Sequence, residues 1–136
     1  MIVMQYADNG SLLSYLDQNI NKLTWRRKSH HLRNIACYLN TIHHSGLVHC
    51  DLHGGNIVLH SIVRRIQFFG GDDDGDDYDT CPFICDFGLS QSVNSRQQNS
   101  TIRGVLPFIA PEVFHTCKFT RKSDIYIFWY YYDCYW

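Results

Sequence analysis

Glutamate is almost absent from this sequence of 136 residues. Of its 13 acidic residues, 12 are aspartate and only Glu112 is glutamate. Any chemistry that needs a glutamate at another position therefore cannot come from these residues. Basic residues are not in excess either, because 12 lysines and arginines leave a formal net charge of -1. This balance argues against a domain built mainly to bind nucleic acid or an anionic membrane surface.

Paired cysteines and long apolar segments are also lacking. The six cysteines are scattered and form no Cys-x-x-Cys pair, and the first residues lack the basic start and apolar core of a secretory signal. The apolar tail, 125–136, contains Asp133 and is too short to span a bilayer. We therefore expect reduced thiols, a cytoplasmic location and no membrane span.

What the sequence does contain is enough apolar material for one domain. Hydrophobic residues make up 45% of the chain. Apolar residues recur at three- and four-residue intervals from Thr24 to His44, which predicts a helix that ends before Gly46. The adjacent pair His30 and His31 is expected on the surface of this helix. Its buried face is expected to consist of Leu32, Ile35, Ala36, Leu39, Ile42 and His43.

Shorter elements are predicted on either side of this helix. A short helix is expected over 11–16, another opens at Pro111, and a last one starts after Asp124 and runs into the aromatic tail. Short strands around a polar loop are predicted at three apolar runs, 47–49, 57–59 and 83–85.

An acidic segment separates the second and third of these runs. Residues 61–82 contain two adjacent glycines and six aspartates between positions 72 and 79. An EF-hand would have Gly70 and Cys81 at its first and last ligand positions, so this is no calcium loop. We expect a solvated acidic insertion. The Ser/Gln/Asn-rich stretch 89–107 predicts a second long loop.

Three short motifs follow one another along the chain. His49-Cys50-Asp51-Leu52-His53-Gly54-Gly55-Asn56 fits the pattern H-R-D-L-x-x-x-N at every specified position except Cys50. Asp86-Phe87-Gly88 fits D-F-G, and Ala110-Pro111-Glu112 fits A-P-E. In this order the motifs resemble the C-terminal lobe of a eukaryotic protein kinase. The sequence Asp-Leu-His-Gly-Gly-Asn is similar to the serine/threonine type, in the tyrosine-kinase-like group.

The resemblance covers nearly the whole chain and implies an α+β fold. The expected fold is a mostly helical protein-kinase-like C-lobe fragment with short β-strands around the catalytic loop. Residues 1–136 would then be a partial kinase domain. Residues 1–10 would form the last N-lobe strand and the hinge, and residues 11–136 a partial C-lobe with the acidic insertion at about 61–82. Asp124 resembles the aspartate of the central helix that supports the catalytic loop.

The resemblance also implies an activity, ATP-dependent phosphorylation of serine or threonine in a protein substrate. Asp51 would be the catalytic base, and His53, where many serine/threonine kinases have lysine, would be catalytic beside it. Asn56 and Asp86 would bind Mg²⁺ and hold ATP, because Mg²⁺ prefers oxygen ligands. The adenine edge of the nucleotide site would be formed by Met4, Gln5, Tyr6 and Ala7.

The sequence departs from the family pattern in three ways. Cys50 replaces the usual catalytic-loop arginine, so we expect no activation through a phosphate paired with that residue. Trp129 stands where the family helix usually has glycine. The 136 residues also contain no G-x-G-x-x-G loop, no V-A-I-K strand and no helix glutamate to hold its lysine.

These departures leave three interpretations open. The first is a truncated serine/threonine kinase, which we expect to be inactive or nearly so with these residues alone. The second is a pseudokinase-like module that binds partners through its surface. The third is a gene-model fragment without independent activity. The substrate, the pathway and the oligomeric state are not set by the sequence.

Overall fold

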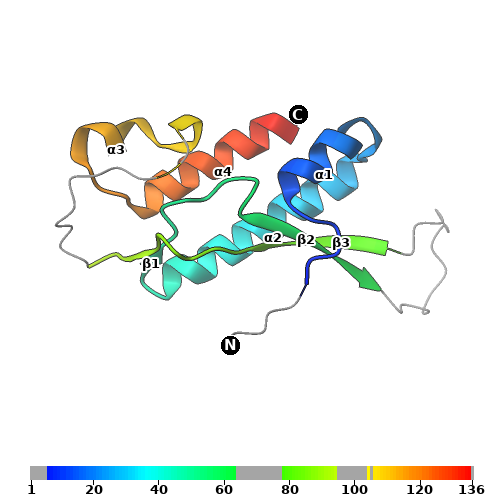
Figure 1. Ribbon diagram of the computed structural model, residues 1–136, viewed down its shortest axis with the longest axis horizontal. Helices are drawn as coiled ribbons and strands as arrows, with labels where there is room; N and C mark the ends of the chain where they lie inside the picture. The colour runs from blue at the N-terminus through cyan, green and yellow to red at the C-terminus, as the bar shows by residue number, and fades with distance from the viewer. Residues whose placement is uncertain (1–5, 64–77, 95–103, 105, 136) are drawn as a thin grey trace.

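The computed structural model describes residues 6–63, 78–94, 104 and 106–135. Within these residues the helices are α1 (Leu12–Asn19), η1 (Ile20–Lys22), α2 (Trp25–His44), η2 (Leu106–Phe108), α3 (Pro111–Thr116) and α4 (Arg121–Tyr135). The strands are β1 (Leu47–Val48), β2 (Ile57–Val63), β3 (Tyr78–Ile84) and β4 (Gln91–Ser92). The predicted α+β class is confirmed. Figure 1 shows the β2–β3 hairpin toward one end of the molecule and α3 toward the other.

Helix α2 begins and ends where its sequence predicts. The Thr24 hydroxyl accepts the Arg27 backbone N–H at 3.4 Å, which caps the first turn. Gly46 follows the helix with a φ of 76°, a left-handed conformation that glycine adopts without steric cost. Helix α1 is capped in the same way by Ser11 and continues to Asn19, three residues beyond the predicted end.

The buried face of α2 is largely the predicted one. Its buried residues include Leu32, Ile35, Leu39 and His43, and Ile42 is half-buried. Ala36 is exposed, so its predicted burial is wrong. The elements that pack most closely on α2 are β3, β1 and α4, and Ala36 lies on the exposed side of the helix.

His31 is also placed differently from the prediction. It is fully buried rather than on the surface of α2. Its Nε2 lies 2.8 Å from the Thr80 hydroxyl and 3.1 Å from the Thr80 carbonyl oxygen. A buried imidazole is tolerated when it has a hydrogen-bond partner. For His31 this partner is Thr80 of strand β3.

The strands form two separate antiparallel pairs. In the longer pair, Ile57 lies opposite Ile84 and the register continues along β2 and β3. In the shorter pair, β1 lies against β4, with Val48 opposite Gln91. The strands before and after the 49–56 loop flank it as predicted, but each is hydrogen-bonded to a strand that follows much later in the chain.

The ends of the expected acidic insertion belong to the β2–β3 hairpin. Residues 61–63 and 78–82 are strand, and Cys81 and Pro82 are buried. The prediction of a solvated segment is therefore wrong at both ends, because ladder pairing and side-chain burial hold them in the fold. Residues 64–77 lie outside the described residues.

Helix α4 begins at Arg121, before the predicted start. Thr120 and Ser123 cap it reciprocally, with the Thr120 N–H donating to Ser123 Oγ at 2.9 Å and the Ser123 N–H donating to Thr120 Oγ1 at 3.4 Å. Asp124 therefore lies inside the first turn of the helix, where its carboxylate can reach the 49–56 loop.

The main core lies between α1, α2, α4 and the β2–β3 hairpin. Its buried members are Leu12, Leu16, Leu23, Leu32, Ile35, Leu39, Leu52, Ile57, Leu59 and Ile127. Leu52 belongs to the 49–56 loop and is fully buried, so the loop is anchored in the core. In the part of the chain that the structure describes, no helix combines the length and apolarity needed to cross a membrane.

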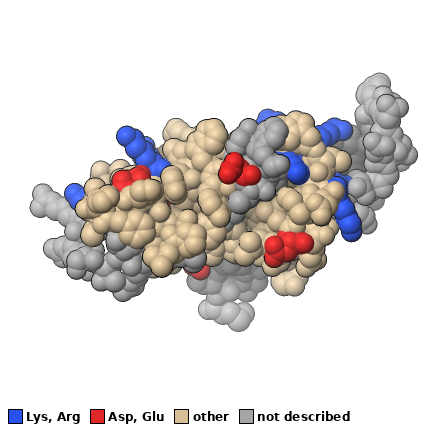
Figure 2. Space-filling model, turned by 90° about the horizontal axis from the view of Figure 1, so that it is seen from above, with Lys and Arg blue, Asp and Glu red and all other residues tan. Residues whose placement is uncertain are grey.

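The charged side chains on the face drawn in Figure 2 do not gather in one patch. In Figure 2, lysine and arginine side chains stand apart from one another, with aspartate and glutamate side chains between them. The five cysteines whose side chains are described are all free thiols: Cys37, Cys50, Cys81, Cys85 and Cys117.

The two leucines at the start of α1 provide a matched test of the core. Leu12 is fully buried, whereas Leu13 is 51% exposed. Leu12→Ala should lower the free energy of unfolding by about 2–5 kcal/mol, because it leaves a cavity. Leu13→Ala should change it by less than about 0.5 kcal/mol. Urea denaturation of both variants measures the difference, and similar losses would contradict this arrangement of α1.

Candidate active site

The 49–56 loop is held by one buried carboxylate. Asp124 in the first turn of α4 is fully buried. Its Oδ2 accepts the His49 backbone N–H at 2.9 Å, and its Oδ1 accepts the Cys50 backbone N–H at 3.1 Å. His43, at the end of α2, donates from Nε2 to Oδ2 at 2.9 Å. Three donors from two elements therefore replace the water that a charged group loses on burial.

The backbone of the loop turns sharply where it meets this carboxylate. Cys50 has a φ of 69°, a left-handed conformation that costs a residue with a side chain of order 1 kcal/mol. The bonds to Asp124 hold it there. The next residue, Asp51, then lies partly exposed, with 19% of its side chain accessible.

Asp51 and Asn56 are in direct contact across the loop. Asn56 Nδ2 donates to the Asp51 carbonyl oxygen at 2.9 Å and to Asp51 Oδ2 at 3.2 Å. Because the amide nitrogen makes both bonds, the amide oxygen of Asn56 is directed away from Asp51. The two side chains are thus fixed as one unit, with an accessible carboxylate on one side and an amide oxygen on the other.

Asp86 is connected to the same loop through Cys85. The Cys85 backbone N–H donates to the Asn56 carbonyl oxygen at 2.9 Å, and His49 Nε2 lies 3.0 Å from the Cys85 carbonyl oxygen. Asp86 follows with a φ of 59° and an exposed side chain whose Oδ1 accepts the Gly88 N–H at 3.1 Å. The backbone of Cys85 is therefore bonded twice to the 49–56 loop, and it places the next residue, Asp86, beside that loop.

His53 completes the group of predicted side chains in the loop. Its Nδ1 accepts the Gly55 backbone N–H at 3.1 Å, and its Nε2 lies 3.8 Å from Asp51 Oδ2. The ring of Phe108, from η2, stacks on the imidazole. The structure thus brings Asp51, His53 and Asn56 together.

The residues expected at the adenine edge are only partly described. Met4 and Gln5 lie outside the described residues. Tyr6 is 82% exposed, and the Ala7 carbonyl oxygen accepts the Gly10 N–H at 3.3 Å in a turn before α1. Two backbone bonds join this turn to β2, from the Asn9 N–H to the Leu59 carbonyl and from the Leu59 N–H to the Gly10 carbonyl. Of the predicted edge, Ala7 is therefore linked through this turn to the strand that follows the 49–56 loop.

Asp8 strengthens this attachment. Its carboxylate accepts the Ser61 backbone N–H at 2.8 Å and lies 3.2 Å from His60 Nδ1. The hydrogen bonds from Ser61 lower the pKa of Asp8, with a smaller contribution from His60.

The donor set of Asn56 and Asp86 fits Mg²⁺. Both offer hard oxygen atoms, and Mg²⁺ usually takes one or two carboxylates while phosphates and water complete its octahedral shell. Among the residues whose side chains the structure describes, no group of three or more His, Cys, Asp and Glu could hold a metal ion by itself. Phosphate oxygens of a nucleotide and water would complete the ligand shell of a metal ion held by Asn56 and Asp86.

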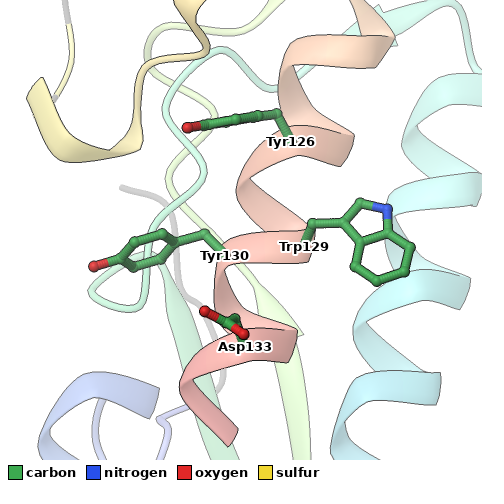
Figure 3. A pocket seen from close by; sticks show the side chains of 4 residues that line it. All are labelled: Tyr126, Trp129, Tyr130 and Asp133. Carbon is green, nitrogen blue, oxygen red and sulfur yellow. The ribbon is translucent and has the colours of Figure 1, made fainter. Parts of the chain in front are cut away.

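A separate shallow hollow of about 360 Å³ lies on α4, lined by Tyr126, Trp129, Tyr130 and Asp133. Figure 3 shows that all four come from the one helix, with Tyr126 and Tyr130 pointing to one side and Trp129 to the other. Trp129 is 61% exposed. The hollow is an open helix face, and none of its four residues belongs to the 49–56 loop.

Comparison with known proteins identifies the family. Residues 1–130 match the family model described as Protein tyrosine and serine/threonine kinase. The chain belongs to the protein kinase family. This confirms the resemblance that the three motifs carry.

Individual relatives are similar over almost the entire chain. This chain is 29% identical over 133 residues to a probable leucine-rich repeat receptor-like protein kinase of Arabidopsis thaliana. It is 31% identical over 134 residues to a putative receptor protein kinase of Zea mays, and 28% identical over 127 residues to a probable serine/threonine-protein kinase of Dictyostelium discoideum. Each alignment covers 93% of this chain but only 10%, 14% and 7% of the respective relative. The chain thus spans roughly a tenth of the length of these kinases.

The sequence did not predict the contacts that three residues make in this site. His43 was expected only as part of a packed helix face, yet it donates to Asp124. Gly55 and Phe108 both contact His53, and neither was singled out. Two signals for these residues were present in the sequence: the place of Gly55 in the motif, and the place of Phe108 just before Ala-Pro-Glu. Neither signal indicates a contact with the imidazole ring of His53.

Cys50 occupies the position of the usual arginine and is buried. Only 3% of it is exposed. The pKa of its thiol is raised to about 12, mainly by burial and secondly by the negative charge of the Asp124 carboxylate. A neutral thiol offers no positive charge to a phosphate group, which agrees with the expectation from sequence.

Asp124→Asn should loosen the 49–56 loop. An amide in place of the carboxylate turns an NH₂ group toward backbone donors and leaves at least one N–H without an acceptor, at a cost of about 2–4 kcal/mol. The matched control is Asp133→Asn, an exposed position on the same helix, with an effect below about 0.5 kcal/mol. Urea denaturation measures stability, and hydrogen exchange should accelerate at the amides of His49 and Cys50. Unchanged exchange at both amides would exclude this role of Asp124.

Cys50 should resist alkylation in the folded chain. The thiolate is the reactive form, and a thiol with a pKa of about 12 remains protonated at pH 8. Iodoacetamide at pH 8 should therefore modify Cys50 at least about 100-fold more slowly than Cys37, which is exposed on α2. Mass spectrometry of tryptic peptides measures both rates. The difference should vanish in guanidinium chloride, and equal rates in the folded chain would contradict the buried position.

Proposed function

We propose that this chain carries the catalytic loop of an ATP-dependent protein kinase that phosphorylates serine or threonine. The contact between Asp51 and Asn56, at 2.9 and 3.2 Å, is the observation that supports this proposal most. It fixes a carboxylate and an amide oxygen, which phosphoryl transfer uses as base and metal ligand, on one rigid loop.

The residues of the site would have separate roles in phosphoryl transfer. Asp51, partly exposed, accepts the proton of the attacking hydroxyl group. Asn56, from the loop, and Asp86, from the segment after β3, would hold Mg²⁺. When bound, ATP with Mg²⁺ supplies the phosphoryl group and neutralises the charge of its phosphates. Asp124 acts through the backbone, since its bonds to His49 and Cys50 keep Asp51 in place.

The proposal extends to the organisation of the chain. Residues 1–10 would contribute the last N-lobe strand and the hinge, and residues 11–136 the C-lobe portion. The partner would be a protein substrate, in the cytoplasm. The 136 residues contain neither a glycine-rich loop nor the lysine–glutamate pair that catalysis requires. They alone should therefore bind nucleotide without transferring phosphate at a measurable rate.

Nucleotide binding tests the proposal directly. ATP with Mg²⁺ should raise the melting temperature of the chain, and ATP with EDTA should raise it less. A ligand at 100 times its dissociation constant stabilises the folded state by about 2.7 kcal/mol. Asp86→Ala should remove the Mg²⁺-dependent part, whereas Asp17→Ala, an exposed carboxylate on α1, should retain it. No response of the wild-type chain at millimolar ATP would contradict the proposal and favour a pseudokinase-like interaction module.

A radiolabel assay tests the expected inactivity. With labelled ATP and Mg²⁺, the purified chain should incorporate no label, and Asp51→Asn should behave in the same way. Autophosphorylation by the wild type that disappears in Asp51→Asn would show that these residues suffice for catalysis.

A further inference from the structure

One face of helix α4 has exposed side chains in a regular order. Spaced three or four residues apart, and therefore on one face, are Lys122, Tyr126, Trp129, Tyr130 and Asp133, all of them exposed. The exposed fraction is 42% for Tyr126, 61% for Trp129 and 43% for Tyr130. The face therefore has a cation near the start of the helix, aromatic rings in the middle and an anion near the end.

The aromatic rings of this face are set apart from one another. Figure 3 shows the ring of Trp129 on one side of α4 and the rings of Tyr126 and Tyr130 on the other, with the hollow of about 360 Å³ among them. A second helix can place its own side chains in such a hollow, because packed helices fit ridges into grooves. Tyrosine and tryptophan are also enriched at protein–protein interfaces. The face therefore has the shape and composition of a helix-packing surface.

This face is complementary to itself when two copies lie antiparallel. Lys122 and Asp133 are its first and last members, and the pair Tyr126 and Trp129 has the same midpoint along the helix. A two-fold axis through that midpoint brings Lys122 of each copy opposite Asp133 of the other. The same axis brings the aromatic rings of the two copies against each other. One symmetry operation therefore satisfies both the charges and the rings.

The charges select the antiparallel orientation. Two antiparallel copies form two pairs of opposite charge, whereas two parallel copies would place lysine beside lysine and aspartate beside aspartate. Like charges placed opposite each other disfavour an association. Antiparallel helices also bring the positive end of each helix dipole near the negative end of the other. A second copy of this chain thus matches the face in charge as well as in shape.

We propose that this face of α4 is the surface through which two copies of the chain associate, antiparallel about a two-fold axis. Trp129 and the two tyrosines supply the apolar contact, and Lys122 and Asp133 set the orientation. One helix face is smaller than the interface of a permanent dimer, so the dimer should form at micromolar concentration and dissociate on dilution. The association involves neither nucleotide binding nor phosphoryl transfer, and it is independent of the proposed function.

Sedimentation velocity at increasing protein concentration tests the association. The wild-type chain should change from monomer to dimer without larger species, because a two-fold contact closes on itself. Trp129→Ala should raise the dissociation constant at least about 30-fold, as the loss of a central aromatic residue does. The matched control is Trp25→Ala, because Trp25 is 54% exposed but lies on α2. A cooperative melting transition shows that each variant is folded.

Charge reversal tests the orientation. Lys122→Asp brings aspartate opposite aspartate, and Asp133→Lys brings lysine opposite lysine, so either change alone should weaken the association at least about tenfold. A mixture of the two single variants should associate again, because each contact then joins a lysine and an aspartate. The double variant should associate for the same reason. Both positions are exposed, and each new charge has the sign that the helix dipole favours at its end, so the fold should be retained.

Three results would overturn this proposal. The first is a wild-type chain that stays monomeric up to about 200 µM, which would leave the face to another occupant, such as a further segment of a longer protein. The second is an equal effect of Trp129→Ala and Trp25→Ala. The third is a pair of single charge variants that associate alone as well as the wild type does, or that fail to associate when mixed.

Discussion

The structure depends on the carboxylate of Asp124. It is the point at which the end of α2, the start of the 49–56 loop and the first turn of α4 meet, through His43 and two successive backbone N–H groups. A buried charge is stable only when its partners are in place. These elements are therefore favoured to form together, and the left-handed backbone at Cys50 is part of the same arrangement.

The described contacts between the loop and the segment before Ala-Pro-Glu include no pair of opposite charges. Where the family usually has an arginine, the chain has a buried thiol, and the segment before Ala-Pro-Glu touches the loop through the ring of Phe108 on His53. Gly104 lies on the same side, since a Cβ there would be 3.4 Å from Asp51 Oδ1. Ring stacking and close backbone approach need no phosphate group to place Gly104 and Phe108 against the loop.

Local signals in the sequence were sufficient for helix α2 and for the position of the loop, but not for the end of α1 or the start of α4. Thr24 and Gly46 define the ends of α2 through their own capping geometry, and the spacing of the 49–56 motif located the residues that meet there. The burial of His31 could not be predicted in this way, because its partner lies 49 residues away on β3. The same applies to Phe108, whose contact with the loop depends on how η2 and α4 are packed and not on any local pattern.

The turn before α1 has a mechanical consequence for the loop. Both backbone groups of Leu59 are bonded to this turn, at 3.2 and 2.9 Å, and Leu59 is only three positions after Asn56 in the chain. That distance is about 10 Å of extended chain, and a hydrogen-bonded strand resists stretching and shear. The turn before α1 and the side-chain amide of Asn56 are therefore held at fixed positions along β2, and neither can shift along this strand without breaking the bonds at Leu59.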